Sequence, residues 1–397
     1  MTSSSWPAVG GETHRWLHRD PMASRRTLLE NRGDFTAAVV PEIARLTPAL
    51  AGAAAARAQE ATRAMTAFGV TSDRMAALPF SAVLLRGESA TSSQIENLTV
   101  HARKLSLAAV GAHVGGNAEL VARNVFAMQA AIDAASDLNA DAVRRMHREL
   151  TVGVQDDAGE FRDQWVWIGG RSPVTASYVA PRHEAVPAAV EDLVLFLQRR
   201  DLDPTVQAAI AHAQFETIHP FTDGNGRTGR AIVSSLLRAR GVVDNVTVPI
   251  SSGLLHDIDG YIAALTAYRA GRPTAIVECF SDAAMASLAN ASILMADVEA
   301  FHDRVLDSRR RVTASLRAVA RFCCSEPAFT AGMLESIGGV PKATAYRTVD
   351  ELTTVGLIRH ERSVKVKGQK VWVVPAVLTA LDEFAERAGR RTYGSSE

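Results

Sequence analysis

Two segments with the apolar spacing of helices are joined by the sequence His219-Pro220-Phe221-Thr222-Asp223-Gly224-Asn225-Gly226-Arg227-Thr228-Gly229-Arg230. Glycine and asparagine tolerate positive φ, so the backbone N–H groups of the Gly-Asn-Gly turn can face inward as an anion-binding nest. The turn also opens the second helix, whose N-terminal N–H groups and dipole attract negative charge. We therefore predict a phosphate-binding loop between two helices.

The side chains of this loop suit phosphoryl chemistry. Arg227 and Arg230 lie one helical turn apart and can contact phosphate oxygens from one face. Asp223 is a hard oxygen ligand, placed to hold Mg²⁺ against those phosphates. His219 can accept a proton from an attacking hydroxyl near neutral pH. Phe221 is the apolar residue expected to anchor the loop in the core.

Other interpretations of the loop fit less well. A histidine at a helix end is often purely structural, but His219 is accompanied by the other groups of the loop. Gly224, Gly226 and Gly229 also spell G-x-G-x-x-G, the pattern of dinucleotide-binding turns. That pattern requires a strand before it, whereas the segment 204–218 has a helical period. A P-loop requires Lys-Ser or Lys-Thr after the glycines, and the sequence has neither there.

The loop resembles the signature of the Fic family, H-P-F-x-[DE]-G-N-G-R-x-x-R, at every specified position. The resemblance implies a mainly α fold with a Fic-like helical core. It also implies a nucleotidyltransferase that moves AMP from ATP to a Ser, Thr or Tyr hydroxyl of a target protein. His219 would then be the general base and Asp223 the Mg²⁺ ligand. Relatives that phosphorylate their targets carry Lys at the position of Gly226, which disfavours that chemistry here.

The same resemblance assigns nucleotide binding to residues in and around the loop. Arg230 would hold the γ-phosphate, and the preceding residues would cradle the α- and β-phosphates. The segment 159–181 resembles the family's β-hairpin flap, which pairs with an extended segment of the target and covers the nucleotide. An ordinary hairpin is the alternative interpretation of that segment. The full nucleotide-binding set is Gly169, Gly170, Asp223, Gly224, Asn225, Gly226, Arg227, Arg230 and, near the adenine, Tyr261.

An inhibitory motif is indicated upstream. Ser92-x-x-x-Glu96-Asn97 resembles the family's [ST]-x-x-x-E-[GN] sequence, which implies that Glu96 restrains the enzyme. A glutamate beside Arg230 would form a charge-assisted pair and occupy the group meant for the γ-phosphate. We expect an amphipathic helix to start at Ser92, because apolar residues recur every three or four positions from Ile95 to Ala109. The alternative to an inhibitory role is that Ser93-x-x-Glu96 is only the capping box that starts this helix. We favour the inhibitory interpretation because the complete motif follows downstream.

The last ninety residues resemble a winged helix-turn-helix. Helices are expected over 329–337 and 341–355, with Ala345, Val349, Leu352 and Val355 buried. Two β-prone stretches follow, at about 357–360 and 370–374, with Gly368 in the turn between them. Four of the five lysines of the chain lie here, which makes residues 330–375 a candidate DNA-binding surface. Winged helices also dock proteins, so the sequence leaves both partners open.

Length and composition limit the number of domains, the kinds of partner and the cellular location that we expect. The 397 residues suggest several domains, and we expect an N-terminal helical region at 1–110, a catalytic core at 111–300 and the winged helix at 301–397. Equal numbers of basic and acidic residues, 43 each, exclude a global field that draws the protein to nucleic acid or lipid. Three cysteines cannot form a disulfide framework, and no long apolar run is evident. We expect a cytoplasmic protein without a membrane segment; the resemblance suggests a homodimer.

The leading interpretation is a protein adenylyltransferase that uses ATP and Mg²⁺ and is autoinhibited by Glu96. Two alternatives stay open. One is a DNA-binding regulator whose Fic-like core senses a nucleotide. The other is a de-AMPylating phosphodiesterase, in which Glu96 would position water.

Overall fold

A computed structural model describes residues 6–17, 31–74 and 78–389. The chain forms two compact units, each assembled from separate segments. The first comprises Met1–Thr62, Gln129–Arg240 and Asp259–Ser281, and the second comprises Arg63–Met128, Gly241–Ile258 and Asp282–Glu397. Neither unit coincides with the three contiguous domains expected from the sequence, whose boundaries stay a prediction.

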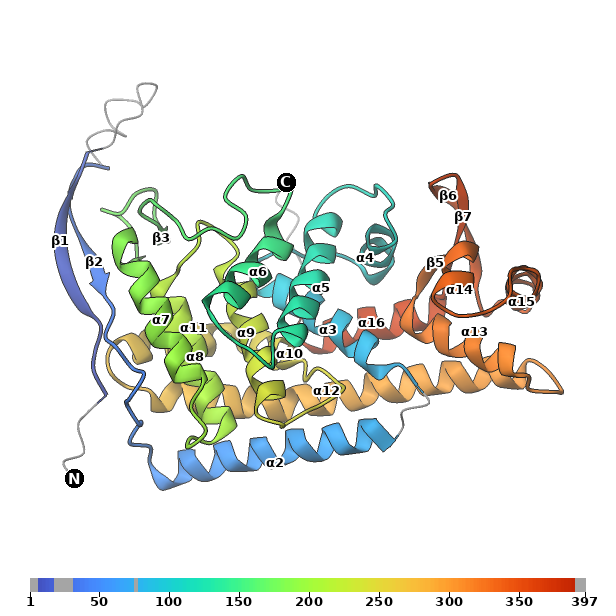
Figure 1. Cartoon of the computed structure of the whole chain (residues 1–397), viewed down its shortest axis with the longest axis horizontal. Helices are drawn as coiled ribbons and strands as arrows, with labels where there is room; N and C mark the ends of the chain where they lie inside the picture. Colours follow the sequence, from blue (N-terminus) through green and yellow to red (C-terminus); the bar gives the residue numbers. More distant parts are fainter. Residues whose placement is uncertain (1–5, 18–30, 75–77, 390–397) are drawn as a thin grey trace. The chain divides into compact units, whose positions relative to one another are not determined.

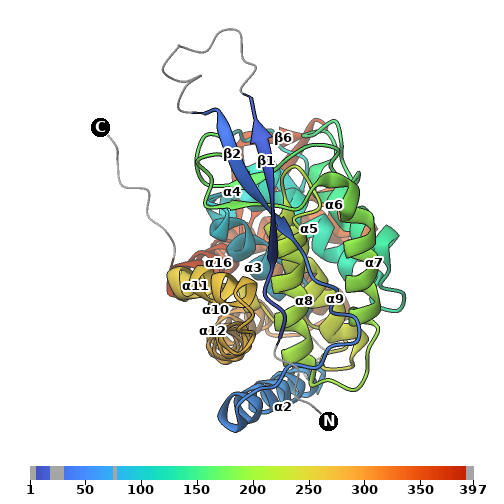
Figure 2. The same cartoon turned by 90° about the vertical axis from the view of Figure 1, so that its left-hand side faces the viewer.

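The first unit is mainly helical and carries two small antiparallel sheets (Figures 1 and 2). One sheet pairs β1 with β2, and the other pairs β3 with β4. Its elements are β1 (Gly10–Trp16), β2 (Gly33–Val39), the start of α2 (Gly52–Arg74), the end of α5 (Ala118–Asp133), α6 (Ala140–Thr151), β3 (Trp167–Ile168), β4 (Tyr178–Val179), the short 3₁₀ helix η1 (His183–Ala185), α7 (Val186–Leu197), α8 (Pro204–Ile218), α9 (Asn225–Ala239), α11 (Ile258–Arg269) and the start of α12 (Thr274–Asp307).

Helix α8 is the central element of this unit. Asp203 begins it by accepting hydrogen bonds from the N–H groups of Thr205 and Val206, and Pro204 occupies the first turn, where no donor is needed. Every residue from Thr205 to Ile218 is buried, so α8 is covered on all sides. The sequence predicted this helix with the same bounds, and its presence before the glycines confirms that the loop is not a dinucleotide-binding turn.

The N-terminal hairpin was not expected from the sequence. β1 and β2 run side by side in Figure 2, in register from Gly10 opposite Val39 to Trp16 opposite Gly33. Within the N-terminal region expected to be helical, helix α2 begins only at Gly52, since the prolines at positions 41 and 48 disfavour helix before that point.

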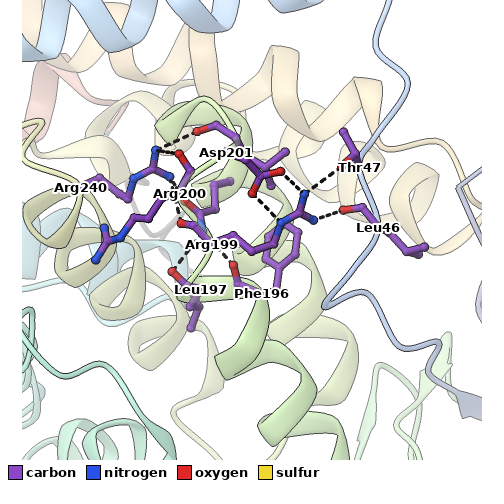
Figure 3. Close-up of polar contacts among 10 residues, drawn as sticks. Leu46, Thr47, Phe196, Leu197, Arg199, Arg200, Asp201 and Arg240 are labelled. Carbon is purple, nitrogen blue, oxygen red and sulfur yellow. Dashed lines mark hydrogen bonds and ion pairs between the residues drawn. The ribbon is translucent and has the colours of Figure 1, made fainter.

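A cluster of arginines ties α7 to the chain around it (Figure 3). Arg199 donates to the carbonyl oxygen of Leu46 and, at 2.9 Å, to the Thr47 hydroxyl. Arg240 donates to the Leu202 carbonyl at 2.9 Å and to the Arg200 carbonyl at 3.3 Å. Positive charge at a helix C-terminus complements the helix dipole, so this cluster stabilises the turn between α7 and α8.

The second unit holds the remaining helices and a three-stranded antiparallel sheet with the order β5-β7-β6. Its elements are the rest of α2, α3 (Phe80–Ile95), α4 (Ala102–Ala109), most of α5, α10 (Ile250–His256), most of α12, α13 (Ala314–Ser325), β5 (Ala328–Thr330), α14 (Ala331–Ser336), α15 (Lys342–Thr354), β6 (Arg359–Val366), β7 (Gln369–Val373) and α16 (Pro375–Arg387).

The inhibitory motif lies at the end of a helix, so the predicted helix start at Ser92 is wrong. Helix α3 ends at Ile95, and the Ser93 hydroxyl donates to the Ser89 carbonyl within α3 instead of capping a new helix. Asn97 has φ 61°, and Asn97 and Leu98 donate their backbone N–H groups to Gln94 and Ser93. This is a Schellman cap, and it excludes the capping-box alternative. The serine and glutamate spacing is compatible with either end of a helix, which explains the error.

The C-terminal segment contains the predicted helix, glycine turn, helix and two strands. The first helix begins at Ala331 because 328–330 form β5 instead. Ala345, Val349 and Leu352 are buried as expected. Val355 is 59% exposed, since α15 ends one residue before it. Gly368 forms the turn between β6 and β7 with φ 76°.

Two further expectations concern the environment of the protein. Cys279, Cys323 and Cys324 are free thiols. Helix α12 is long and apolar enough to cross a membrane by length and composition, but 56% of its most apolar window is buried inside the protein. Core helices pass the same test, so this is weak support for a membrane span.

Candidate active site

His219 stands at the C-terminal end of α8 in a left-handed conformation, with φ 50° and ψ 61°. Its backbone N–H still donates to the Phe215 carbonyl at 2.9 Å. A left-handed non-glycine residue is strained, so the surrounding structure must hold it in place. The turn directs the chain out of α8 and into the loop that leads to α9.

Side chains hold the carbonyl groups that α8 leaves without partners. Arg162 donates from Nε to the His219 carbonyl at 2.8 Å and from Nη2 to the Ile218 carbonyl at 3.5 Å. The Tyr178 hydroxyl donates to the Thr217 carbonyl at 2.5 Å, and Arg269 donates to the next carbonyl upstream at 3.3 Å. Positive and hydroxyl donors at a helix C-terminus satisfy these carbonyls and complement the dipole. They fix the backbone at His219.

The loop itself is built on reciprocal hydrogen bonds. The Asn225 amide accepts from the Phe221 N–H and donates to the Phe221 carbonyl, both at 2.9 Å. The Phe221 ring is fully buried, as predicted, and stacks on His147 with a centroid distance of 3.7 Å. Because Asn225 is used in this way, its amide is a scaffold of the loop.

His147, on α6, is a second support that the sequence did not reveal. Its Nδ1 accepts from the Gly159 N–H at 3.0 Å, so the other ring nitrogen carries the proton and donates to the Asp223 carbonyl at 3.0 Å. Burial lowers the pKa of His147 from 6.5 to about 4. The ring is therefore neutral near pH 7, as this pair of hydrogen bonds requires.

The segment predicted to form an anion nest lies at the start of α9, and its anion-binding role stays a prediction. Gly224 precedes the helix with φ 78°, and the first turn of α9 contains no acidic residue. N–H groups at a helix N-terminus favour a bound anion. Arg227 and Arg230 follow on the same helix with only 5% and 3% of their surface exposed. Two buried arginines therefore lie on the helix that this glycine turn opens.

Asp223 is the residue assigned to a metal. Its carboxylate is 73% exposed, with one oxygen accepting from the Gly224 N–H at 2.6 Å and the other 3.7 Å from Arg227. The residues that the structure describes contain no cluster of three or more His, Cys, Asp or Glu groups suited to a metal. Mg²⁺ often binds through one carboxylate together with substrate phosphates. An accessible carboxylate beside a phosphate nest fits that mode of binding.

Two buried side chains lie one turn and two turns before the loop. Glu216, 6% exposed, has carboxylate oxygens 3.8 Å from His219 Nδ1 and 4.0 Å from His212 Nε2. His212 is fully buried, and burial together with the charge of Arg230 lowers its pKa to about 3. Its Nε2 lies 2.7 Å from the hydroxyl of Tyr261, which is on α11. The assignment of Tyr261 to adenine stays a prediction.

The flap is a short hairpin, which confirms the predicted strand pairing. Trp167 lies opposite Val179 and Ile168 opposite Tyr178. Gly169 and Gly170 make the turn with φ 70° and 68°, and a side chain at Gly170 would come within 2.4 Å of the Thr175 carbonyl. Their nucleotide-binding role stays a prediction, because the geometry alone already requires glycine there.

The N-terminal hairpin packs against this flap. Phe35, Ala37 and Val179 form a buried cluster, and the rings of Trp16 and Trp167 meet at 5.9 Å in an edge contact. The Phe35 and Trp165 rings are 5.2 Å apart and nearly perpendicular. Aromatic contacts of this kind add to the burial they accompany, so the flap rests on a rigid aromatic base.

The predicted inhibitory residues belong to the second unit. Ser92 is fully buried in α3, and Glu96 is an exposed residue at its C-cap. The left-handed conformation of Asn97 explains why Gly or Asn suits that position of the motif. The pairing of Glu96 with Arg230, which is in the first unit, stays a prediction.

Known proteins were compared with the chain by sequence and by structure. A model of the Fic/DOC family matches residues 137–237. The protein adenylyltransferase fic-1 of Caenorhabditis elegans is 34% identical over 110 residues, which are 26% of this chain and 20% of that protein. The protein adenylyltransferase Fic of Drosophila melanogaster is 32% identical over 116 residues, 26% of this chain and 21% of that protein. The chain thus spans about a fifth of these curated relatives.

A solved structure extends the similarity of the fold. A Fic family protein from Desulfovibrio desulfuricans G20 superposes with a TM-score of 0.53 at 22% identity, and the match covers 83% of this chain and 98% of that one. The family model covers both the loop and the flap. Residues 137–237 of the chain therefore form a domain that matches the Fic/DOC family.

Proposed function

We propose that the protein transfers AMP from ATP to a hydroxyl side chain of a target protein. The observation that carries the proposal is the juxtaposition of His219 with the nest at the start of α9. A histidine on a fixed turn lies five residues before the glycine that opens α9, and two buried arginines follow on the same helix. The names of the sequence relatives support the same chemistry.

In this mechanism His219 removes the proton from the target hydroxyl. The hydroxyl oxygen attacks the α-phosphorus, a new P–O bond forms, and the bond to pyrophosphate breaks. The nest of α9 and the guanidinium groups of Arg227 and Arg230 stabilise the charge on the phosphate oxygens. The flap would hold an extended segment of the target beside the nucleotide through backbone hydrogen bonds.

Asp223 is the residue we assign to Mg²⁺. When bound, the ion would neutralise phosphate charge and assist the departure of pyrophosphate. Removal of divalent cations with a chelator is expected to abolish transfer, and Asp223→Asn is expected to raise the Mg²⁺ concentration needed for half-maximal rate.

We further propose that Glu96 inhibits transfer by pairing with Arg230. The match to the inhibitory motif supports this assignment, and so does the rigid cap that Asn97 gives to α3.

We propose a cytoplasmic location. The free cysteines support a reducing compartment.

The test is a mass measurement on purified protein incubated with ATP and Mg²⁺. Transfer to the protein itself or to an added protein would appear as the mass of one AMP, lost on mutation of His219. An enzyme that removes AMP would instead release it from a modified protein, and Glu96→Gly would abolish that release.

DNA binding by the C-terminal segment is a second proposal. On β6, β7 and the turn between them, Arg362, Lys365, Lys367 and Lys370 are all exposed, and no acidic residue lies between them in the sequence. Such a cluster suits phosphate contacts. A gel shift with duplex DNA that weakens steeply with salt, and is lost on Lys367→Glu with Lys370→Glu, is the expected result.

A further inference from the structure

The catalytic histidine and the flap share one buried guanidinium. The side chain of Arg162 is 3% exposed. Its guanidinium donates to the Gln164 carbonyl at 2.9 Å and to the Pro181 carbonyl at 2.6 Å, which lie before and after the two strands of the flap. Arg162 also donates to the His219 carbonyl at 2.8 Å. Its own N–H donates to the Pro220 carbonyl at 3.0 Å. One side chain therefore fixes the start of the flap, the end of the flap and the turn that carries His219.

Tyr178 makes an independent connection between the same two elements. It lies on β4, opposite Ile168, and its hydroxyl donates to the Thr217 carbonyl two residues before His219. The guanidinium of Arg269 lies 3.8 Å from the centre of the Tyr178 ring and also donates to the Glu216 carbonyl. Tyr178 thus connects β4 of the flap to the C-terminal end of α8.

These contacts use the geometry of arginine in full. The planar guanidinium presents five donors in a fixed fork, whereas a lysine ammonium is a point donor on a flexible stem. Three nitrogen atoms of Arg162 donate to four carbonyl groups, which belong to the segment before β3, the segment after β4 and the end of α8. A lysine at this position would keep the charge but would lose the simultaneous contacts.

We propose that Arg162, assisted by Tyr178, is a positioning residue that sets His219 and the flap as one unit. A target segment aligned on the flap would then have its hydroxyl aligned with the histidine that deprotonates it. The inference rests on the proposed transfer reaction, because it assigns His219 the role of base. Arg162 would thereby couple the binding of a target segment at the flap to the position of His219.

The test compares Arg162→Lys, Arg162→Ala and Tyr178→Phe in a Glu96→Gly background. Arg199→Lys is the matched control, because Arg199 also donates to a backbone carbonyl of the first unit, that of Leu46 (Figure 3). Its other side-chain acceptors, Thr47 and Asp201, lie outside the flap and the loop. We would measure the maximal rate of self-AMPylation and the ATP concentration for half-maximal rate. Displacement of a reacting group by about 1 Å can cost about 100-fold in rate.

The expected result for Arg162→Ala is a fall in maximal rate of about 100-fold, with a smaller fall for Arg162→Lys and Tyr178→Phe. The half-saturating ATP concentration should stay the same, because the nest and its arginines are untouched. Arg199→Lys should match the parent. If Arg162→Ala does not fold, Arg162→Lys and Tyr178→Phe carry the test.

A second readout does not depend on activity. The imidazole resonances of His219 should shift in the Arg162 and Tyr178 variants, and the Ala180 N–H of the flap should exchange faster in the same variants. Unchanged rates and an unchanged His219 signal in folded Arg162→Lys and Tyr178→Phe would overturn the inference. If no variant transfers AMP at all, the proposed function fails, and the resonances and exchange rates still decide whether His219 and the flap move together.

Discussion

Two arginine-rich regions of the first unit perform the same structural task with different consequences. Around Arg240, guanidinium groups bind the carbonyls of the turn after α7, and around Arg162 they bind the carbonyls at the end of α8. Burial lowers the pKa of Arg162 to about 10, and burial with the charge of Arg200 also lowers the pKa of Arg240.

The difference lies in the residue whose carbonyl is held. Arg162 binds the carbonyl of His219 itself, whereas Arg240 and Arg199 bind carbonyls of residues that carry none of the proposed chemistry. The same type of hydrogen bond therefore serves stability in one place and placement of a reacting group in the other. Contact type alone does not separate these roles, but the identity of the acceptor does.

The largest effect is expected from His219→Ala. Loss of a general base lowers a rate by about 100- to 10,000-fold, so self-AMPylation should fall by that factor. Binding of ATP, followed by calorimetry, should persist because Arg227 and Arg230 remain. A variant that transfers AMP at the parental rate would remove His219 from the mechanism.

Acid should lower the free energy of unfolding through two buried histidines, His147 and His212, that lie near His219 and not near Arg240. His147 and His212 have lowered pKa values in the folded protein, so the unfolded chain binds protons more readily and stability falls as pH drops below about 6.5. For His147 the loss is complete near pH 4 and amounts to about 3 kcal/mol.

Chemical denaturation at several pH values measures this loss. His147→Gln should reduce the slope of the stability curve between pH 6.5 and 4, while the contribution of His212 to that slope should remain. Parallel curves for the parent and His147→Gln would show that His147 is not the titrating group.

Arg240→Met should lower stability without lowering the transfer rate of the folded protein. It removes the donor of the Leu202 carbonyl, a group of a buried residue, at a cost of about 1–3 kcal/mol. The Arg200 carbonyl is exposed and can accept from water instead. The midpoint of urea unfolding reports the loss. Reduced transfer by fully folded Arg240→Met would erase the distinction between the two regions.

The smallest effect is expected from Arg199→Ala. Its pair with the exposed Asp201 is a surface ion pair, worth at most about 1 kcal/mol. The Leu46 carbonyl and the exposed Thr47 hydroxyl also lose their donor, but both residues are solvent-accessible and can accept from water. The unfolding midpoint should barely move in high salt. A loss as large as that of Arg240→Met would place Arg199 among the essential contacts of the turn.

The sequence predicted local features better than distant ones. The loop, the burial of Phe221 and the flap hairpin follow from neighbouring residues, because glycine conformations and apolar spacing are local properties. Arg162 was missed, since its partners are backbone carbonyls as far as 57 residues away, and a carbonyl has no sequence signature. His147 was missed for the same reason, with partners 12 and 76 residues away.

The helix at Ser92 shows a different source of error. The Ser-x-x-Glu spacing describes a capping box, but the same residues close α3 when Asn97 adopts a left-handed conformation. The apolar residues before Ser92 favour the closing position, and they were the signal that could have decided it. The function assigned to Glu96 does not depend on which end of a helix carries it.

The central claim is AMP transfer with His219 as base and Glu96 as the restraint. The most direct measurement is intact mass spectrometry of the parent, Glu96→Gly and Glu96→Gly/His219→Ala proteins after incubation with ATP and Mg²⁺. A one-AMP adduct that increases strongly in the single variant and disappears in the double variant is the predicted result. An adduct of equal extent in all three proteins, or none in any form that is folded and binds ATP, would contradict it.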